Sequence, residues 1–431
     1  MKRLAYDRLL EWKNKVDRKP LILNGARQVG KTWILKEFGA NEYSNMAYIN
    51  CDEVEEMKTL FYDFDTERLI RNFSVLSGEV IKPEETLIIL DEIQVVPLAI
   101  TSLKYFCEKA SQYHIVVAGS LLGIGLHEGT GFPVGKVDEI NLYPLSFKEF
   151  MMALGKEVLI SNMEEHRWSE LSALGTIFTE LLRQYYYVGG MPEVVKSYVE
   201  NQDVFEVRNI QKQILAGYRR DFSKHIQAEI LPKVNMVWDS IPAQLAKENK
   251  KFIYSAIKKG GRAKEFENAI QWLIDAGLAY KVLRISKVEK PLKFYEDFDS
   301  FKLFIVDLGL LGALVDVDSK DVLINNNAFK EYKGAFTEQF VLQELKALGC
   351  EIYYHSRERS ALELDFVIQK YNVYPLEVKA EENLKSKSLK AIYDSNNDLK
   401  PVRLSMAGFK EQDWMVNVPL YLAAEWISAA E

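Results

Sequence analysis

Residues 20–33 read Pro-Leu-Ile-Leu-Asn-Gly-Ala-Arg-Gln-Val-Gly-Lys-Thr-Trp, and this stretch decides the fold. Gly25 to Thr32 match the pattern G-x-x-x-x-G-K-[ST] in full, after the apolar run Leu21–Leu23 and before the helix-like run Trp33–Phe38. Glycines allow a tight turn that points backbone N–H groups at phosphate oxygens, and the helix N-terminus adds positive potential. The stretch predicts a phosphate-binding loop between a strand and a helix; a chance glycine turn is the alternative.

Each residue type in the loop has an expected role. Lys31 would reach the β- and γ-phosphates of a nucleoside triphosphate, and the Thr32 hydroxyl would hold Mg²⁺. The sequence therefore predicts ATP and Mg²⁺ as ligands. The expected nucleotide-binding residues are Gly25, Ala26, Arg27, Gln28, Val29, Gly30, Lys31, Thr32 and Trp33.

A second apolar run supplies the other half of this site. Leu87–Leu90 are four consecutive apolar residues, as in a strand buried on both faces, and Asp91 and Glu92 follow them. Asp91 would hold the magnesium through water, and Glu92 would act as general base on the attacking water. A further run, Ile115–Ala118, leads to Ser120, which would either sense the γ-phosphate or cap the next helix. The adjacent glutamate favours hydrolysis over a small-molecule kinase.

Composition limits the class of protein. The 431 residues carry 55 basic and 62 acidic side chains, for a net charge of −7, and 48% are apolar. These values indicate a globular chain and exclude a uniformly basic nucleic-acid binder. The cysteines (Cys51, Cys107 and Cys350) form no CxxC pair, which fits a cytoplasmic protein. No signal peptide and no membrane-spanning run are expected.

The chain is expected to contain three domains in an α/β architecture. Short apolar runs alternate with amphipathic segments over residues 1–190, which predicts a P-loop domain with a parallel sheet. Residues 191–325 read as mostly helical with a short strand at Leu278–Ile285, and residues 326–431 return to mixed α and β. The polar tripeptide Asn325–Asn327 is the expected boundary. The other expected strands are Leu21–Asn24, Ala47–Asn50, Thr86–Leu90, Ile115–Ala118, Val137–Leu142, Ile352–His355, Glu363–Gln369 and Val373–Val378.

Several phrases resemble one family. GARQVGKT (25–32), LIILDE (87–92), VVAGS (116–120) and LYPLSFKEF (142–150) are similar to prokaryotic AAA-type ATPases fused to a nuclease-like C-terminal domain. Later phrases extend the resemblance over the chain: YVGGMPEVV (187–195), SIPAQLAKENKKF (240–252), AIQWLIDAGLAY (269–280) and FKLFIVDLGLL (301–311).

The resemblance carries further expectations. It implies a helical lid, a winged-helix-like middle domain and a homo-oligomer. It also implies that the G-x-P element ending at Pro192 touches the nucleotide, although an ordinary turn is equally expected there. Where relatives often show Gly-Arg, this chain has Lys136, which lacks the planar guanidinium fork. Arg27, Arg219 and Arg220 remain candidates for an arginine finger.

The middle section holds a basic cluster. Between Lys247 and Lys264 there are seven basic residues, opposed only by Glu248. The apolar residues of Phe266–Ala276 recur at helical spacing, and a strand-like run follows. Such a segment predicts DNA or RNA contact through its basic face. A solvated lysine-rich face, or a winged helix that binds protein, is the alternative.

The C-terminal section resembles the PD-(D/E)xK nucleases. Asp365 lies on one expected strand, and Glu377 and Lys379 lie at alternate positions of the next, so these two point to one face. Glu338 lies in the expected helix Phe336–Leu348. In this resemblance Asp365 and Glu377 hold Mg²⁺, Glu338 completes the oxygen shell, and Lys379 orients water or stabilises charge on the phosphate. Leu364 replaces the proline of the signature.

Two hypotheses of different classes follow. In the first, a Mg²⁺-dependent ATPase controls a C-terminal domain that acts on nucleic acid. In the second, the protein is a nucleotide-dependent switch whose C-terminal domain is catalytically inactive and only docks a partner. Metal binding by the C-terminal residues would separate the two.

Overall fold

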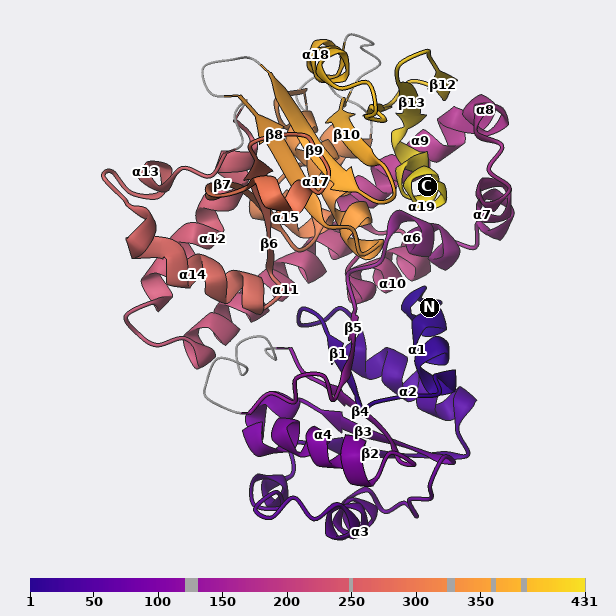
Figure 1. The fold of residues 1–431 in the computed structure, drawn as a ribbon, viewed down its shortest axis with the longest axis vertical. Helices are drawn as coiled ribbons and strands as arrows, with labels where there is room; N and C mark the ends of the chain where they lie inside the picture. Colours follow the sequence, from indigo (N-terminus) through magenta and orange to yellow (C-terminus); the bar gives the residue numbers. More distant parts are fainter. Residues whose placement is uncertain (121–130, 248–250, 324–329, 358–361, 381–385, 431) are drawn as a thin grey trace. The chain divides into compact units, whose positions relative to one another are not determined.

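The computed structural model describes residues 1–120, 131–247, 251–323, 330–357, 362–380 and 386–430. The chain divides into two compact units (Figure 1). The N-terminal unit comprises residues 2–143 together with 271–278, and the C-terminal unit comprises residues 144–270 and 279–431 with Met1. The expected boundary Asn325–Asn327 lies outside the described residues.

The N-terminal unit is built on a five-stranded sheet of order β2-β3-β4-β1-β5. Every neighbouring pair is parallel, and β4 lies between β3 and β1. Parallel strands end at the same edge, so the loop after β1 and the acidic pair at the end of β3 share one edge of the sheet. The strands are β1 (Leu21–Asn24), β2 (Asn45–Asn50), β3 (Thr86–Asp91), β4 (His114–Ala118) and β5 (Asp138–Asn141).

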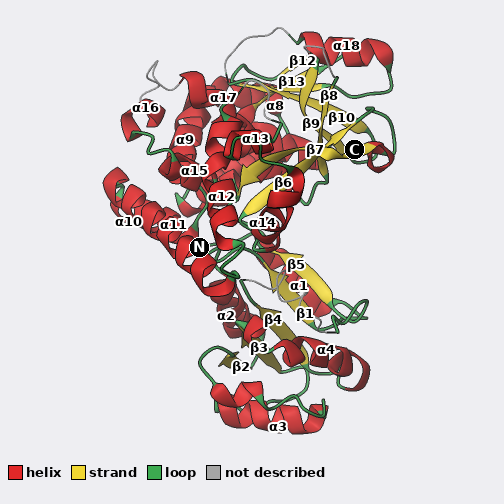
Figure 2. Cartoon of the chain, turned by 90° about the vertical axis from the view of Figure 1, so that its left-hand side faces the viewer, coloured by secondary structure: helices red, strands yellow, loops and turns green. Residues whose placement is uncertain are grey.

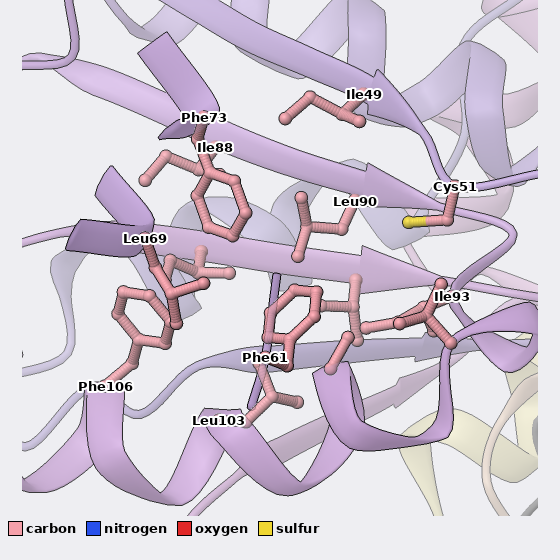
Figure 3. Packing of buried hydrophobic residues seen from close by; sticks show 14 of the residues in the cluster. Ile49, Cys51, Phe61, Leu69, Phe73, Ile88, Leu90, Ile93, Leu103 and Phe106 are labelled. Atoms are coloured by element: carbon pink, nitrogen blue, oxygen red, sulfur yellow. The ribbon is translucent and has the colours of Figure 1, made fainter. Parts of the chain in front are cut away.

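The core of this unit lies between the sheet and helices α3 and α4 (Figure 3). Ile88 and Leu90 of β3 are fully buried, and Phe73 and Phe106 of the two helices stack against each other at 6.3 Å between ring centroids. Asp65 caps α3 by accepting from Arg68 N, and Pro97 begins α4. The helices are α1 (Ala5–Asn14), α2 (Lys31–Glu42), α3 (Thr66–Ser77) and α4 (Pro97–Lys109).

The C-terminal unit surrounds a mixed sheet of eight strands (Figure 2), in the order β12-β13-β11-β10-β9-β8-β6-β7. Strands β6 and β7 form an antiparallel hairpin, and β6 pairs in parallel with β8, with Leu283 opposite Tyr353. The strands are β6 (Ala279–Ile285), β7 (Glu296–Ile305), β8 (Ile352–Ser356), β9 (Glu363–Gln369), β10 (Val373–Val378), β11 (Val402–Ser405), β12 (Lys410–Glu411) and β13 (Val416–Pro419).

Because β6 joins the middle section to the C-terminal strands, one sheet crosses the expected boundary between residues 325 and 326. The three-domain division stays a proposal. The helices after residue 144 are α6 (Phe147–Ala153), α7 (Glu157–Glu164), α8 (Trp168–Leu171), α9 (Gly175–Val188), α10 (Pro192–Asn201), α11 (Val204–His225), α12 (Leu231–Leu245), α13 (Tyr254–Ile257), α14 (Ala263–Asp275), α15 (Leu308–Leu314), α16 (Ser319–Leu323), α17 (Lys330–Ala347), α18 (Lys387–Ser395) and α19 (Ala423–Ala429).

The predicted elements agree with the observed ones in the N-terminal unit, and in the C-terminal unit some strands were missed. Strands β1, β9 and β10 have the predicted bounds, and α17 begins before the predicted helix start at Phe336. Strands β7, β11, β12 and β13 were not predicted. Within the described part of the chain, no helix combines the length and the apolar character needed to cross a lipid bilayer.

Candidate nucleotide-binding site

The loop between β1 and α2 has the backbone geometry of a phosphate cradle. Gly25, Gln28 and Gly30 all have positive φ angles, of 155°, 67° and 93°. A Cβ atom at Gly25 would lie 2.4 Å from the carbonyl oxygen of Leu142, so only glycine fits there. Successive turns of this kind point backbone N–H groups into one concavity.

The Lys31 side chain lies against its own loop. Its Nζ donates to the carbonyl oxygens of Gly25 at 2.7 Å and Ala26 at 2.8 Å, and only 7% of the residue is exposed. Burial lowers the pKa of Lys31 to about 8, against the opposing effect of Glu92 and Asp91. A phosphate would replace the carbonyl partners and favour the charged ammonium.

Thr32 and Asp91 meet as predicted at the edge of the sheet. Thr32 Oγ1 donates to Asp91 Oδ2 at 2.6 Å, although the two residues are 59 positions apart in sequence. Tyr48 on β2 also donates to Asp91 Oδ2, at 3.2 Å. A hydroxyl and a carboxylate are the hard oxygen donors that Mg²⁺ prefers, so these residues fit a magnesium ion that also binds nucleotide oxygens.

Glu92 begins the segment after β3 in the left-handed backbone region, with φ 51° and ψ 40°. Its Oε2 accepts from Gln94 Nε2 at 2.6 Å and from Ser120 Oγ at 3.4 Å. Because β4 lies beside β3, Ser120 at the end of β4 is adjacent to the acidic pair, as predicted. The carboxylate is therefore held in one orientation by donors from two segments.

The remaining residues predicted to bind nucleotide at the loop between β1 and α2 differ in their exposure to solvent. Ala26 and Val29 are buried, whereas Arg27, Gln28 and Trp33 are exposed.

Sequence reasoning missed three residues that hold this site: Tyr48, Gln94 and Arg3. Arg3 donates to Val29 O at 2.9 Å and to Tyr143 O at 2.6 Å, which fixes the loop to the strand end after β5. Tyr48 and Arg3 act through partners distant in sequence, whereas Gln94 acts through Glu92, two positions before it; no motif marks any of the three.

The candidates for an arginine finger differ in their surroundings. Lys136 Nζ forms an ion pair with Glu108 at 2.9 Å, and Arg219 is paired with Asp239 and with Asn235 at 3.2 Å. The identity of a finger stays unassigned among Arg27, Arg219 and Arg220.

The G-x-P element belongs to a buried network of the C-terminal unit. Gly190 N donates to Asp307 Oδ2 at 2.6 Å, and Gly190 O accepts from Leu145 N at 2.6 Å. Gln343 Nε2 donates to Tyr185 OH at 2.7 Å. Pro192 is the first residue of α10. These contacts give the turn a structural role, and the contact between Pro192 and nucleotide stays a prediction.

Each of the C-terminal residues predicted to act together contacts another group of the protein. Asp365 Oδ2 accepts from Val378 N at 2.7 Å, and Lys379 Nζ lies 3.1 Å from Glu377 Oε1. Glu338 instead lies 3.7 Å from the Nζ of Lys302 on β7, a residue that sequence reasoning missed.

A lysine inside an apolar strand was the available signal for Lys302, since a buried cation needs carboxylate partners. Among the described residues, no three His, Cys, Asp or Glu side chains gather as a metal site. Metal binding by Asp365 and Glu377 stays a prediction.

Five of the basic residues of the segment 247–264 are exposed, and Lys251 is half-buried. Lys247, Lys258, Lys259, Arg262 and Lys264 are exposed, and Lys258 pairs with Glu265 at 3.0 Å. Glu248 and Lys250 lie outside the described residues. Helix α14 follows, and the hairpin β6–β7 after it belongs to the eight-stranded sheet. A winged-helix domain stays a prediction.

Comparison with known families agrees with the geometry of the N-terminal unit. Residues 17–151 match the model of an AAA domain. Residues 179–321 and 333–421 match two domains of unknown function, DUF8612 and DUF4143. No curated protein matches the chain. The loop, the acidic pair and the family match together identify a P-loop ATPase domain of the AAA type.

Solved structures similar to this chain include the Walker-type ATPase PABY2304 of Pyrococcus abyssi, which is 14% identical with a TM-score of 0.46 and covers 73% of this chain and 95% of its own. The Aeropyrum pernix ORC1 protein, solved in complex with DNA, is 15% identical with a TM-score of 0.30 and covers 74% and 93%. Cdc6p from Pyrobaculum aerophilum is 13% identical with a TM-score of 0.26 and covers 75% and 96%. At these scores the similarities carry no functional argument.

Proposed function

We propose that the N-terminal unit hydrolyses ATP with the help of Mg²⁺, and that its nucleotide state controls the C-terminal unit. The observation that carries this proposal is the Thr32–Asp91 contact of 2.6 Å beside a glutamate held by Gln94 and Ser120. A cytoplasmic location and a homo-oligomeric assembly remain part of the proposal.

The residues divide the chemistry among them. Backbone N–H groups of the loop and Lys31 would bind the phosphates, and Thr32 and Asp91 would hold Mg²⁺, which offsets the charge that develops on the phosphate oxygens. Glu92 would accept the proton of the attacking water. Gln94 and Ser120 keep its Oε2 oriented, so they act as positioning residues.

Phosphate release from ATP tests this assignment. Glu92→Gln is expected to bind ATP and to hydrolyse it about 10²–10⁴-fold more slowly, because the amide cannot accept the proton. Lys31→Ala is expected to lose nucleotide binding as well. Exposed Glu84→Gln, before the same strand, is the matched control and should hydrolyse like the parent. If Glu92→Gln and Lys31→Ala both retain parental turnover, the site is assigned wrongly.

The nuclease hypothesis and the docking hypothesis require different things of the structure of the C-terminal unit. A nuclease needs Glu338, Asp365 and Glu377 to hold one or two metal ions together, and the described residues contain no such group of three. We therefore favour the docking hypothesis. A partner-docking sheet needs only a folded surface, and it tolerates ion pairs such as Glu377–Lys379.

Cleavage of DNA and RNA in Mg²⁺ or Mn²⁺ decides between them. The docking hypothesis predicts no cleavage above that of the Asp365→Ala and Lys379→Ala variants. Cleavage by the parent that both variants lack would restore the nuclease hypothesis.

A further inference from the structure

Lys302 is a buried cation in the apolar second half of strand β7. It lies on β7 between Phe301 and Leu303, and its side chain is 0% exposed. Its Nζ lies 2.8 Å from Glu363 Oε1 and 3.7 Å from Glu338 Oε2. The ring of Tyr354 on β8 lies 4.9 Å from the same nitrogen. One ammonium thus joins the hairpin β6–β7 to α17 and β9.

The electrostatic balance keeps this lysine charged. Burial alone would lower the pKa of Lys302, but Glu338, Glu363 and Asp365 together outweigh burial and raise it. A buried ammonium costs several kcal/mol unless carboxylates compensate it, and here two lie within 4 Å. The Lys302 ammonium and the neighbouring carboxylates therefore stabilise each other in the folded protein.

We propose that the Lys302 ammonium is the resident cation of this acidic cluster, and that it takes the place of the divalent ion that a nuclease site would hold. Glu338 and Asp365 are two of the carboxylates that the nuclease resemblance assigns to metal, and both act on the lysine charge. Carboxylate oxygens serve an ammonium or a metal ion equally well. A divalent ion at the same acids would meet the repulsion of the ammonium.

The other two residues of the signature, Glu377 and Lys379, pair with each other at 3.1 Å. Asp365 Oδ2 also accepts from Val378 N. The cluster is therefore an internal ion-pair group that attaches β7 of the middle section to the C-terminal strands. This inference does not depend on ATP hydrolysis.

Titration of the 431-residue chain with Mn²⁺ in the absence of nucleotide, followed by the electron paramagnetic resonance signal of free Mn²⁺, tests the proposal. The parent is expected to bind no Mn²⁺ through the C-terminal acids, so Glu338→Gln and Asp365→Asn should titrate like the parent. Lys302→Ala should gain a single Mn²⁺ site, and the added Glu338→Gln should remove it.

Lys281→Ala is the matched control, because it removes a lysine from the neighbouring strand β6 whose Nζ lies over the Phe301 ring at 4.5 Å. It should gain no site. A parental Mn²⁺ site that Glu338→Gln or Asp365→Asn removes would overturn the proposal. So would a folded Lys302→Ala protein that gains no Mn²⁺ site.

A second variant covers the case in which Lys302→Ala does not fold. Lys302→Met combined with Glu363→Gln removes one charge of each sign, so it leaves the net charge of the cluster unchanged. The parental titration decides the main claim in either case. ATP turnover measured on the same samples separates the two proposals, since Lys302 variants that fold should hydrolyse ATP at the parental rate.

Discussion

The Glu344 carboxyl shows how a single buried group sets the pH dependence of this fold. Glu344 on α17 is 3% exposed, and its Oε1 accepts from Phe147 N at 2.8 Å. Burial raises its pKa from 4.5 to about 8, and Glu149 and Glu425 act in the same direction. The folded chain therefore holds a proton that the unfolded chain has released at neutral pH.

The stability from this protonated carboxyl is complete below pH 4.5 and decreases as pH rises through about 8. We expect Glu344→Gln, which keeps the oxygen that accepts from Phe147 N, to remove this loss. The difference between variant and parent in the free energy of unfolding should grow from pH 5 to pH 8, by at most about 5 kcal/mol.

Urea unfolding at a series of pH values measures this difference in the free energy of unfolding. Exposed Glu180→Gln is the control and should follow the parent at every pH. If the free energy of unfolding of Glu344→Gln changes between pH 5 and pH 8 as that of the parent does, Glu344 is not the group responsible.

Individual residues also show what a sequence can and cannot predict. Lys31, Thr32, Asp91 and Glu92 were predicted because each follows an apolar strand at a spacing that the chemistry requires. Tyr48 reaches Asp91 only because β2 and β3 pair in register, and that pairing is not written in any local pattern. Lys302 was missed for the same reason, since its partners lie on α17 and β9.

At the scale of elements, the turn between α9 and α10 leaves no room for a side chain at Gly190. A Cβ atom at Gly190 would lie 2.2 Å from Leu145 O and 2.7 Å from Leu145 N. Backbone atoms cannot give way as a flexible side chain can. We expect Gly190→Ala to lower the free energy of unfolding by about 3 kcal/mol.

Gly217→Ala is the informative control, because Gly217 lies inside α11 with no atom nearer than 4.0 Å to an added Cβ. The same substitution there should raise the free energy of unfolding by about 1 kcal/mol, since alanine favours a helix interior. Thermal unfolding followed by circular dichroism compares the two variants. Equal effects of both substitutions would refute the steric explanation.

Strand prediction succeeded where burial alone dictates the pattern. Strands β1 and β3 are short apolar runs flanked by polar residues, and both were found from sequence. The eight-stranded sheet was not, because the pairing of β6 with β8 joins Leu283 to Tyr353 across 70 residues. Strands β11 and β13, of four residues each, gave too short a pattern.

At the scale of the whole molecule, charge is unevenly distributed along the chain. Residues 191–325 hold 21 basic and 19 acidic residues, for a net charge of +2, whereas residues 1–190 and 326–431 have net charges of −6 and −3. The exposed Lys259, Arg262 and Lys264 lie in the positive section before or at the start of α14. A nucleic-acid backbone would bind this section through counterion release.

We therefore expect duplex DNA to bind weakly, with an affinity that falls steeply as salt rises. Replacing Lys259, Arg262 and Lys264 together by alanine should weaken binding and lower the slope of log affinity against log salt by about 0.9 for each phosphate that the variant no longer neutralises. Fluorescence anisotropy with a labelled duplex measures both quantities.

The control replaces Lys156, Arg167 and Lys196, which are exposed basic residues outside the cluster, and it should leave the slope unchanged. An equal decrease in both triple variants would mean that net charge, not this face, drives binding. Binding unaffected by either triple substitution would favour a protein partner for this segment.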